Sequence, residues 1–316
     1  MRNPLRMACL VLIAAGCCAV YLIHDLNGSF EYALPRRVTK VLAMVLTGFT
    51  IAYATVVFQT ITHNRILTPS IMGLDALYLL LQTVIIFFLG SSHLIVTNKQ
   101  INFLLSVAVM IVFALFLYRF LFKKGGQSIY FLLLIGIIVG TFFSSISTFL
   151  QVLIDPNEFL IVQDRMFASF NNINSDLVWM AIVIVLLVLI YAWRYIKYLD
   201  VLSLGREMAI NLGVPYDSIV KQMLVIVSIF ISISTALVGP ITFFGLIVAN
   251  LSYQFFHTYK HKTLISGAVL MSIIAVVGGQ WFVERVFTFS TTLSVIINFI
   301  GGVYFIYLLL KERKTA

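Results

Sequence analysis

The side chains that could catalyse a reaction or bind a metal are scarce in this sequence, and their spacing matches no catalytic motif. The 316 residues include only 12 Asp and Glu, five His and three Cys. No G-x-x-x-x-G-K-[ST] phosphate loop, H-E-x-x-H metal pair or G-x-S-x-G nucleophile elbow is present. We therefore expect no enzymatic activity, no bound metal and no cofactor in this chain. The histidines lie near the ends of apolar runs, where solvated surface histidines are expected (His24, His63, His93, His257 and His261).

The cysteines share the first apolar run of the sequence (Cys9, Cys17 and Cys18). Neither a disulfide between loops nor a zinc site is built in such a run, so we interpret them as small apolar filler. Asp75 is the carboxylate that comes nearest to the middle of an apolar run, about a turn and a half from its start. Intramembrane carboxylates carry protons or ions in ion-coupled transporters. Asp75 therefore either lines a cavity or interacts with the positive end of its own helix.

The composition is that of a membrane protein. Hydrophobic residues make up 61% of the chain, charged residues 10%, and the mean hydropathy is +1.05, whereas a soluble domain has about 25% charged residues. Apolar runs of about 20 residues can cross a ~30 Å hydrocarbon layer as helices, and unbroken runs favour helices over a barrel. We expect one all-α transmembrane domain, residues 1–316, with about ten spans at 5–23, 38–60, 69–89, 100–122, 129–153, 178–194, 219–238, 241–256, 263–283 and 294–310.

The positions of Lys and Arg predict that both termini lie in the cytoplasm. With that orientation most of the 21 basic residues fall in cytoplasmic loops. The net charge of +9 is then explained by loops beside anionic lipid, without a nucleic-acid partner. Arg2 and Arg6 before an apolar run also fit a signal peptide, but we expect a retained helix because no A-x-A-like site follows. The basic residues left outside are Arg36, Arg37, Lys40, Lys99, Arg165 and Arg285.

A short polar segment, LSLGREMAINLGVPYDS (Leu202–Ser218), lies between the sixth and seventh predicted spans, in the cytoplasm. Gly213 suits the left-handed position after a last helical turn, and Pro215 prevents continuation. We expect a short helix at about 204–214. Its apolar residues recur every four positions and would form a narrow stripe (Leu204, Met208 and Leu212).

This helix could lie on lipid or against another protein. A helix on an anionic lipid surface usually carries basic residues on its polar face. Here the polar face is mixed in sign, with Arg206, Glu207 and Asn211. The mixture favours a protein partner.

The spacing L-G-x-x-x-A-x-x-L-G-V in this segment resembles the cytoplasmic coupling loop of permeases of the iron-siderophore and vitamin B12 class of ATP-binding-cassette (ABC) importers. In that family the loop seats in a groove of the ATPase subunit. The resemblance implies that ATP-driven closure of a partner moves this helix. The residues assigned to coupling are Leu204, Gly205, Glu207, Ala209, Leu212, Gly213 and Val214.

Three further blocks of the same family occur in the same order, so that the resemblance runs from about Leu34 to Lys311. The blocks are GFTIAYATVVFQTITHNRILTPSIMG, GPITFFGLIVANLSYQ and RVFTFSTTLSVIINFIGGVYFIYLLLK. The chain looks most like permeases for catecholate-type ferric siderophores such as petrobactin in low-GC Gram-positive bacteria. The matching residues are Gly48, Gln59, Asn64, Leu67, Pro69, Gly73, Gly239, Pro240, Ile241, Phe243, Gly245, Leu246, Arg285, Leu293 and Gly301.

The chain also departs from the family pattern. Arg65 stands where proline is usual, and Thr55 where glycine is common. Ala249 and Asn250 replace a Pro-His pair, so no role of that pair is carried over. The usual Glu-Leu-Pro of the last block reads Thr292, Leu293, Ser294. These departures indicate a divergent branch.

Arginines at the outer ends of spans oppose the inward charge bias. Arg36 and Arg37 precede the second span and Arg285 follows the ninth. In the resembling family, arginines at these places receive carboxylates of a substrate-binding protein, although the first arginine of the family's R-x-P-R stretch is Ala33 here. The alternative is that their side chains snorkel to the membrane interface.

The resemblance implies a type II ABC importer permease in the bacterial plasma membrane that moves a ferric siderophore inward by alternating access. Its expected partners are a second permease subunit, two ATPases that bind ATP and Mg²⁺, an extracytoplasmic siderophore-binding lipoprotein and the lipid bilayer. The alternative is an ion-coupled secondary transporter of a small solute, for which paired repeats and broken helices are weak here. Candidates for the translocation path are Gln59, Asn64 and Asp75.

Overall fold

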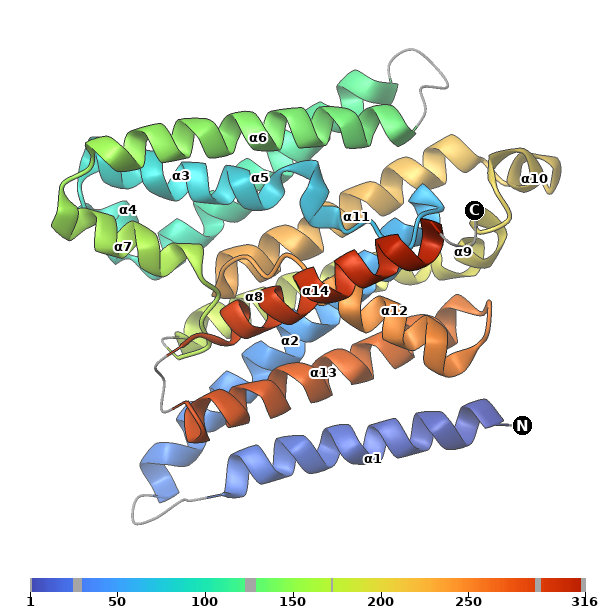
Figure 1. Cartoon of the computed structure of the whole chain (residues 1–316), viewed down its shortest axis with the longest axis horizontal. Coiled ribbons are helices and arrows are strands. Elements are labelled where there is room, and N and C mark those ends of the chain that lie inside the picture. Colours follow the sequence, from blue (N-terminus) through green and yellow to red (C-terminus); the bar gives the residue numbers. More distant parts are fainter. Residues whose placement is uncertain (1, 25–29, 123–128, 172, 288–290, 314–316) are drawn as a thin grey trace.

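The computed structural model describes residues 2–24, 30–122, 129–171, 173–287 and 291–313, and every regular element in these ranges is a helix. The all-α prediction is therefore confirmed. Figure 1 shows α1 beginning and α14 ending at the same end of the bundle, as expected if both termini lie in one compartment. Eight helices are long and apolar enough to span a bilayer: α1 (Arg2–Ile23), α2 (Phe30–Thr62), α5 (Lys99–Phe122), α6 (Ile129–Leu153), α8 (Ser175–Trp193), α11 (Tyr216–Val238), α13 (His261–Arg285) and α14 (Leu293–Arg313).

Two predicted spans are shorter helices than expected. The span predicted at 69–89 is a 3₁₀ turn, η1 (Pro69–Met72), followed by α3 (Leu74–Leu89). The span predicted at 241–256 begins later, as α12 (Phe244–Phe256). Both are preceded by a glycine in the left-handed half of backbone space, Gly73 (φ 80°) and Gly239 (φ 102°), which ends helical geometry there. The remaining helices lie at the bundle ends: α4 (Leu94–Thr97), α7 (Pro156–Met166), α9 (Ile196–Leu202) and α10 (Arg206–Asn211).

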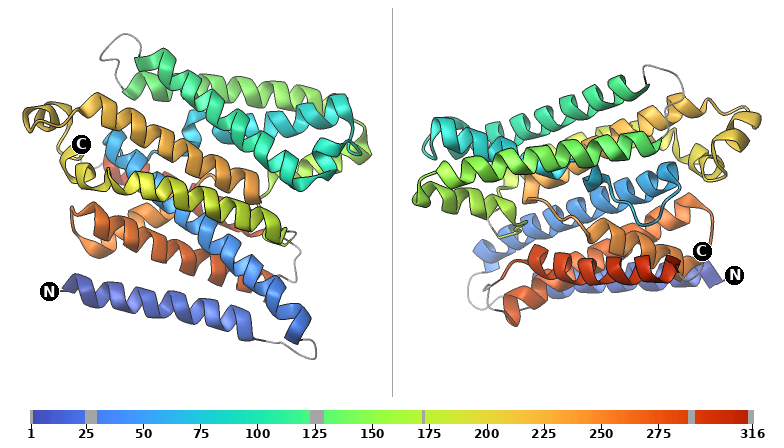
Figure 2. Two further views of the ribbon diagram at one scale, coloured as in Figure 1. Left: turned by 180° about the vertical axis from the view of Figure 1, so that it is seen from behind. Right: turned by 45° about the horizontal axis from the view of Figure 1, so that its top comes forward.

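Helices α2 and α11 form the centre of the bundle. In their most apolar windows 78% and 72% of the residues are buried, compared with 17% in α1 and 22% in α6. Figure 2 shows α2 crossing the middle of the molecule, whereas α1 lies at its edge against α13. The outer helices therefore present apolar side chains to lipid or to another chain, since a membrane helix needs no internal partner for its apolar surface.

Helix α6 approaches the non-helical segment before α3 very closely. A Cβ atom on Gly136 would lie 2.8 Å from the carbonyl oxygen of Ile71, and one on Gly140 would lie 3.1 Å from Cα of Gly73. Small residues four apart allow this contact between backbones. The spacing of Gly136 and Gly140 in the sequence favours this packing role, and the structure agrees.

Gly136→Ala is expected to destabilise the protein by about 1–3 kcal/mol, because its methyl group would force apart α6 and the backbone at Ile71. Gly278→Ala is a matched control, because Gly278 also lies in a long helix and a Cβ there meets nothing within 4 Å. Thermal unfolding in detergent, followed by size-exclusion chromatography, measures both. Equal melting temperatures for the two variants would contradict the packing role.

Candidate functional sites at the two membrane faces

The predicted coupling segment forms a small, well-defined structure at one end of the bundle (Figure 1). Helix α10 is shorter than the 204–214 prediction and has glycines on both sides, Gly205 (φ 98°) and Gly213 (φ 78°). The left-handed conformation predicted for Gly213 is confirmed. Ala209 is fully buried, and its carbonyl oxygen accepts a hydrogen bond from the amide of Val214 at 3.0 Å. One side of the segment is thus attached to the bundle.

The other side of the segment is apolar and exposed. The three residues of the predicted stripe, Leu204, Met208 and Leu212, are 59%, 60% and 62% exposed. Only Met208 lies within α10, because Leu204 precedes the helix and Leu212 follows its last residue. Glu207 is also exposed and lies in the first turn of α10. Such a cluster of large apolar side chains at a polar loop indicates a binding surface. The role of this surface in coupling stays a prediction.

An ion pair that the sequence does not reveal joins α10 to α11. Arg206 donates to Asp217, with Nη2 3.1 Å from Oδ2. This hydrogen bond and the charge of Asp217 raise the pKa of Arg206. Arg206 therefore faces a neighbouring helix as well as solvent. Arg206 and Asp217 are eleven residues apart in the sequence, and this spacing does not predict a contact between them.

At the opposite end of the bundle lies an open, polar cavity of about 960 Å³. It is formed by the ends of α1, α2, α5, α8 and α13, the helix ends predicted to lie outside. Arg36 and Arg37 line it, as predicted for a docking surface, whereas Arg285 lies exposed at the end of α13 and does not line it. The cavity is also lined by Lys40 and Lys99, which the charge bias places outside, and by two acids that we did not single out from the sequence, Asp176 and Glu284.

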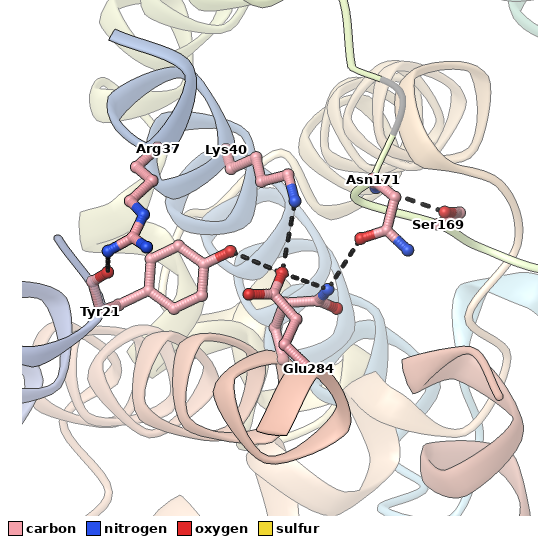
Figure 3. Close-up of polar contacts among 7 residues, drawn as sticks. Tyr21, Arg37, Lys40, Ser169, Asn171 and Glu284 are labelled. Atoms are coloured by element: carbon pink, nitrogen blue, oxygen red, sulfur yellow. Dashed lines mark hydrogen bonds and ion pairs between the residues drawn. The ribbon is translucent and has the colours of Figure 1, made fainter. Parts of the chain in front are cut away.

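Glu284 is the centre of a hydrogen-bond network on this face (Figure 3). Its Oε1 accepts from the hydroxyl of Tyr21 at 2.8 Å, from Gln280 at 3.0 Å and from Lys40 at 3.3 Å. Gln280 also donates to Oδ1 of Asn171 at 3.1 Å. The network joins α1, α2 and α13, so it holds the cavity wall together. In the sequence this network is indicated only by the position of Glu284 next to Arg285.

Arg37 has a structural role in addition to any docking role. Its Nη1 donates to the carbonyl oxygens of Tyr21 and Leu22, each at 3.4 Å, and to that of His24. These carbonyls belong to the C-terminal end of α1, where backbone acceptors lack helical partners and cations are favoured. Arg37 therefore fastens α1 to α2. Arg36 is exposed and is the better placed of the two for an external partner.

Gln59 and Asn64, predicted path residues, shape the non-helical chain after α2. Asn64 Oδ1 accepts from the amide of Ile66 at 2.9 Å, and Gln59 Nε2 donates to the carbonyl oxygen of Arg65 at 2.7 Å. The same carbonyl accepts from Asn250 Nδ2 at 2.9 Å. Backbone groups in a non-helical segment need such partners, because no helix supplies them. Two departures from the family pattern, Arg65 and Asn250, are thus in direct contact.

Asn250→Leu is expected to destabilise the protein by about 0.5–1.5 kcal/mol, because the carbonyl of Arg65 loses one of its two side-chain donors. Gln254→Leu, one turn further along α12, removes an exposed hydrogen bond to Tyr304 and should change stability by less than about 0.5 kcal/mol. Thermal unfolding of the two variants in detergent tests this difference. A larger loss from Gln254→Leu would refute the bracing role of Asn250.

Asp75 lies in the first turn of α3, because a 3₁₀ turn and Gly73 precede this helix. The turn and a half of α-helix that we expected before Asp75 is absent. Its Oδ1 accepts from Thr235 of α11 at 2.9 Å. It also lines a mostly apolar cavity of about 540 Å³ bordered by α6 and α14 residues. Both alternatives from the sequence are therefore present together: a cavity wall and a helix N-terminus. Participation in a transport path stays a prediction.

His261 differs from the expectation that the histidines are solvated. It is only 4% exposed at the start of α13 and is bonded to two other helices. The prediction was wrong because the residue follows a polar loop in the sequence, while the chain folds α9 over it.

An all-helical domain with eight bilayer-length helices, an exposed polar helix at one face and a basic cavity at the other defines a multi-pass membrane transport protein. The family model of the FecCD transport family matches residues 10–311. The chain belongs to this family, and we treat it below as a multi-pass permease of the plasma membrane.

The chain is similar to known proteins over nearly its full length. The chain is 62% identical to the petrobactin import system permease protein YclO of Bacillus subtilis, over 100% of both chains. It is 37% identical to the petrobactin import system permease protein FatC of Bacillus anthracis, over 96% of this chain and 88% of the relative. A solved metal-chelate type ABC transporter in an inward-facing conformation has the same fold, with a TM-score of 0.80, 22% identity and coverage of 98% and 99%.

Proposed function

We propose that this chain is the membrane-spanning subunit of an ABC importer that carries a ferric siderophore of the petrobactin type into the cytoplasm. The observation that supports the cargo is the 62% identity to a petrobactin import permease over the whole of both chains. The chain itself performs no covalent chemistry and binds no cofactor in this proposal. ATP and Mg²⁺ bind to separate ATPase subunits.

The proposed cycle begins outside. A lipid-anchored binding protein places acidic side chains near Arg36 and Arg285 and delivers the chelate to a path between this chain and a second permease subunit. Two ATPases then close on ATP and displace the α10 segment. Helices α2, α11 and α13 respond, and the path opens to the other side. A shift from 1:99 to 99:1 between two such states requires about 5.5 kcal/mol, which ATP binding and turnover can supply.

The proposal is tested by reconstituting the chain with its cognate permease, ATPases and binding protein in lipid vesicles. Accumulation of radiolabelled iron from ferric petrobactin should require ATP and should survive a protonophore. Vesicles with an ATPase that lacks its phosphate-loop lysine serve as the control. Uptake by this chain alone, driven by a proton or sodium gradient, would instead support the secondary-transporter alternative and would give Asp75 an ion-carrying role.

A further inference from the structure

A buried chain of hydrogen bonds joins three helices near the predicted coupling segment. His261, at the start of α13, has Nδ1 2.7 Å from Oδ1 of Asp200 in α9. Its Nε2 lies 2.9 Å from Oγ1 of Thr60, near the end of α2. The imidazole and the threonine are 4% and 7% exposed, so water does not compete strongly for the bond between them, whereas the side chain of Asp200 is 43% exposed.

Asp200 also closes the end of α13. Its Oδ1 accepts the backbone N–H of His261 at 2.8 Å, whereas the residue in the N-cap position, Lys260, makes no side-chain cap. A carboxylate is favoured at a helix N-terminus because unpaired N–H groups and the helix dipole are positive there. Helix α9 therefore supplies the cap of α13.

The donors and acceptors fix how this chain is protonated. An ionised Asp200 only accepts, so Nδ1 of His261 carries a hydrogen. With a neutral imidazole, Nε2 accepts the hydroxyl hydrogen of Thr60. With an imidazolium, Nε2–H donates to Oγ1 of Thr60, whose own hydrogen then bonds to the carbonyl oxygen of Val56 at 2.8 Å. The connection from Asp200 through His261 to Thr60 is present in both arrangements. It does not depend on the charge of the imidazole.

Asp200 lies in the helix that is directly connected to the predicted coupling segment. Helix α9 ends at Leu202, and the carbonyl oxygen of Leu202 accepts from the amide of Gly205, which directly precedes α10, at 3.1 Å. At the other end of the network, α13 and α2 pack along each other in the bundle centre. A movement of α10 that carries α9 with it must therefore pull on the cap of α13 and on the end of α2.

We propose that Asp200, His261 and Thr60 form the positioning link that transmits displacement of the α9–α10 segment to α13 and α2. The proposal rests on the function proposed above, in which an ATPase moves α10. In this proposal these residues act by position and do not bind cargo or nucleotide. They act by keeping the moving cytoplasmic segment and the transmembrane core in one rigid unit.

The link is tested in the reconstituted importer by measuring iron transported per ATP hydrolysed. Thr60→Val removes the hydroxyl at nearly constant volume, and Asp200→Ala removes the acceptor. Each should lower this ratio about fivefold or more, the effect of losing one hydrogen bond of typical strength. Thr60→Ser and Asp200→Asn keep a hydroxyl and an acceptor and should retain most of the ratio.

Thr62→Val is the matched control, because Thr62 is 6% exposed in the same last turn of α2 and its hydroxyl bonds only to carbonyls of its own helix. It should retain the wild-type ratio. Each variant's yield and assembly with the ATPase, judged by size-exclusion chromatography, shows that it is folded. The double variant Thr60→Val/Asp200→Ala should lose no more than either single variant, because both act through His261.

Equal ratios in Thr60→Val and Thr62→Val, whether both normal or both reduced, would overturn the link. Additive losses in the double variant would do the same. If the wild-type importer shows no ATP-dependent uptake, the proposed function is wrong. The link is refuted separately, by the variant comparisons above. If Thr60→Val does not assemble, the comparison of Asp200→Ala with Asp200→Asn still decides the matter.

Discussion

Met208→Glu is expected to reduce ATP-dependent iron uptake about a hundredfold, because a charge would be forced into the apolar contact that we assign to the ATPase. The side chain of Met208 is 60% exposed in the middle of the stripe, so the substitution should leave the fold unchanged. Uptake into vesicles and retention of the ATPase during purification measure the effect. Both should fall together.

Two further variants separate the apolar contact from general damage to α10. Met208→Leu keeps a large apolar side chain and should retain uptake. Ile210→Glu places the same charge about 200° around the helix, given 100° per residue, and should reduce uptake less. Normal uptake by Met208→Glu at normal protein levels would show that this stripe is not the coupling surface.

Reversing the charges of Arg36 and Arg285 together is expected to slow association with the binding protein about a hundredfold at low ionic strength, since steering by complementary charge raises association rates by this order. Both side chains are exposed at the outer face. The loss should shrink at high salt, because the Debye length falls from about 10 Å at 0.1 M to about 3 Å at 1 M. Stopped-flow or surface-based binding to the importer in nanodiscs gives the rate constants.

Lys260→Glu/Lys262→Glu is a suitable control, because it changes the net charge equally on exposed residues at the other end of the bundle. It should leave association with the binding protein unchanged. Arg37 is left intact in this experiment because its bonds to α1 carbonyls hold the outer end of the bundle together. A loss of binding that does not depend on salt would argue against electrostatic docking.

The long spans were predictable because lipid imposes a simple rule. A helix that crosses the membrane must be about 20 residues long and apolar, and the prediction for 129–153 coincides with α6. The rule fails where the chain is non-helical inside the bundle, before α3 and α12. Before α3 the side-chain amides of Gln59 and Asn250 satisfy the carbonyl of Arg65, and Asn250 comes from a distant part of the sequence.

The candidate sites divide in the same way. The exposure of Leu204, Met208 and Leu212 and the conformation of Gly213 follow from spacing within eleven residues, so local pattern predicts them. Arg36 lies at an outer helix end, against the concentration of basic residues in cytoplasmic loops, and the sequence alone shows this. By contrast, the dual role of Arg37, the network at Glu284 and the buried position of His261 depend on pairs such as Tyr21 with Glu284.

The sequence by itself determined that this chain is an all-helical membrane protein with a short cytoplasmic helix, because hydropathy, charge bias and helical period act over a few turns of chain; the permease function came from the family resemblance. Only the tertiary structure decided which polar groups meet. Asp200, His261 and Thr60 come together because α9, α13 and α2 converge at one end of the bundle. Buried hydrogen-bonding groups must find partners wherever packing places them, and no local pattern records that choice.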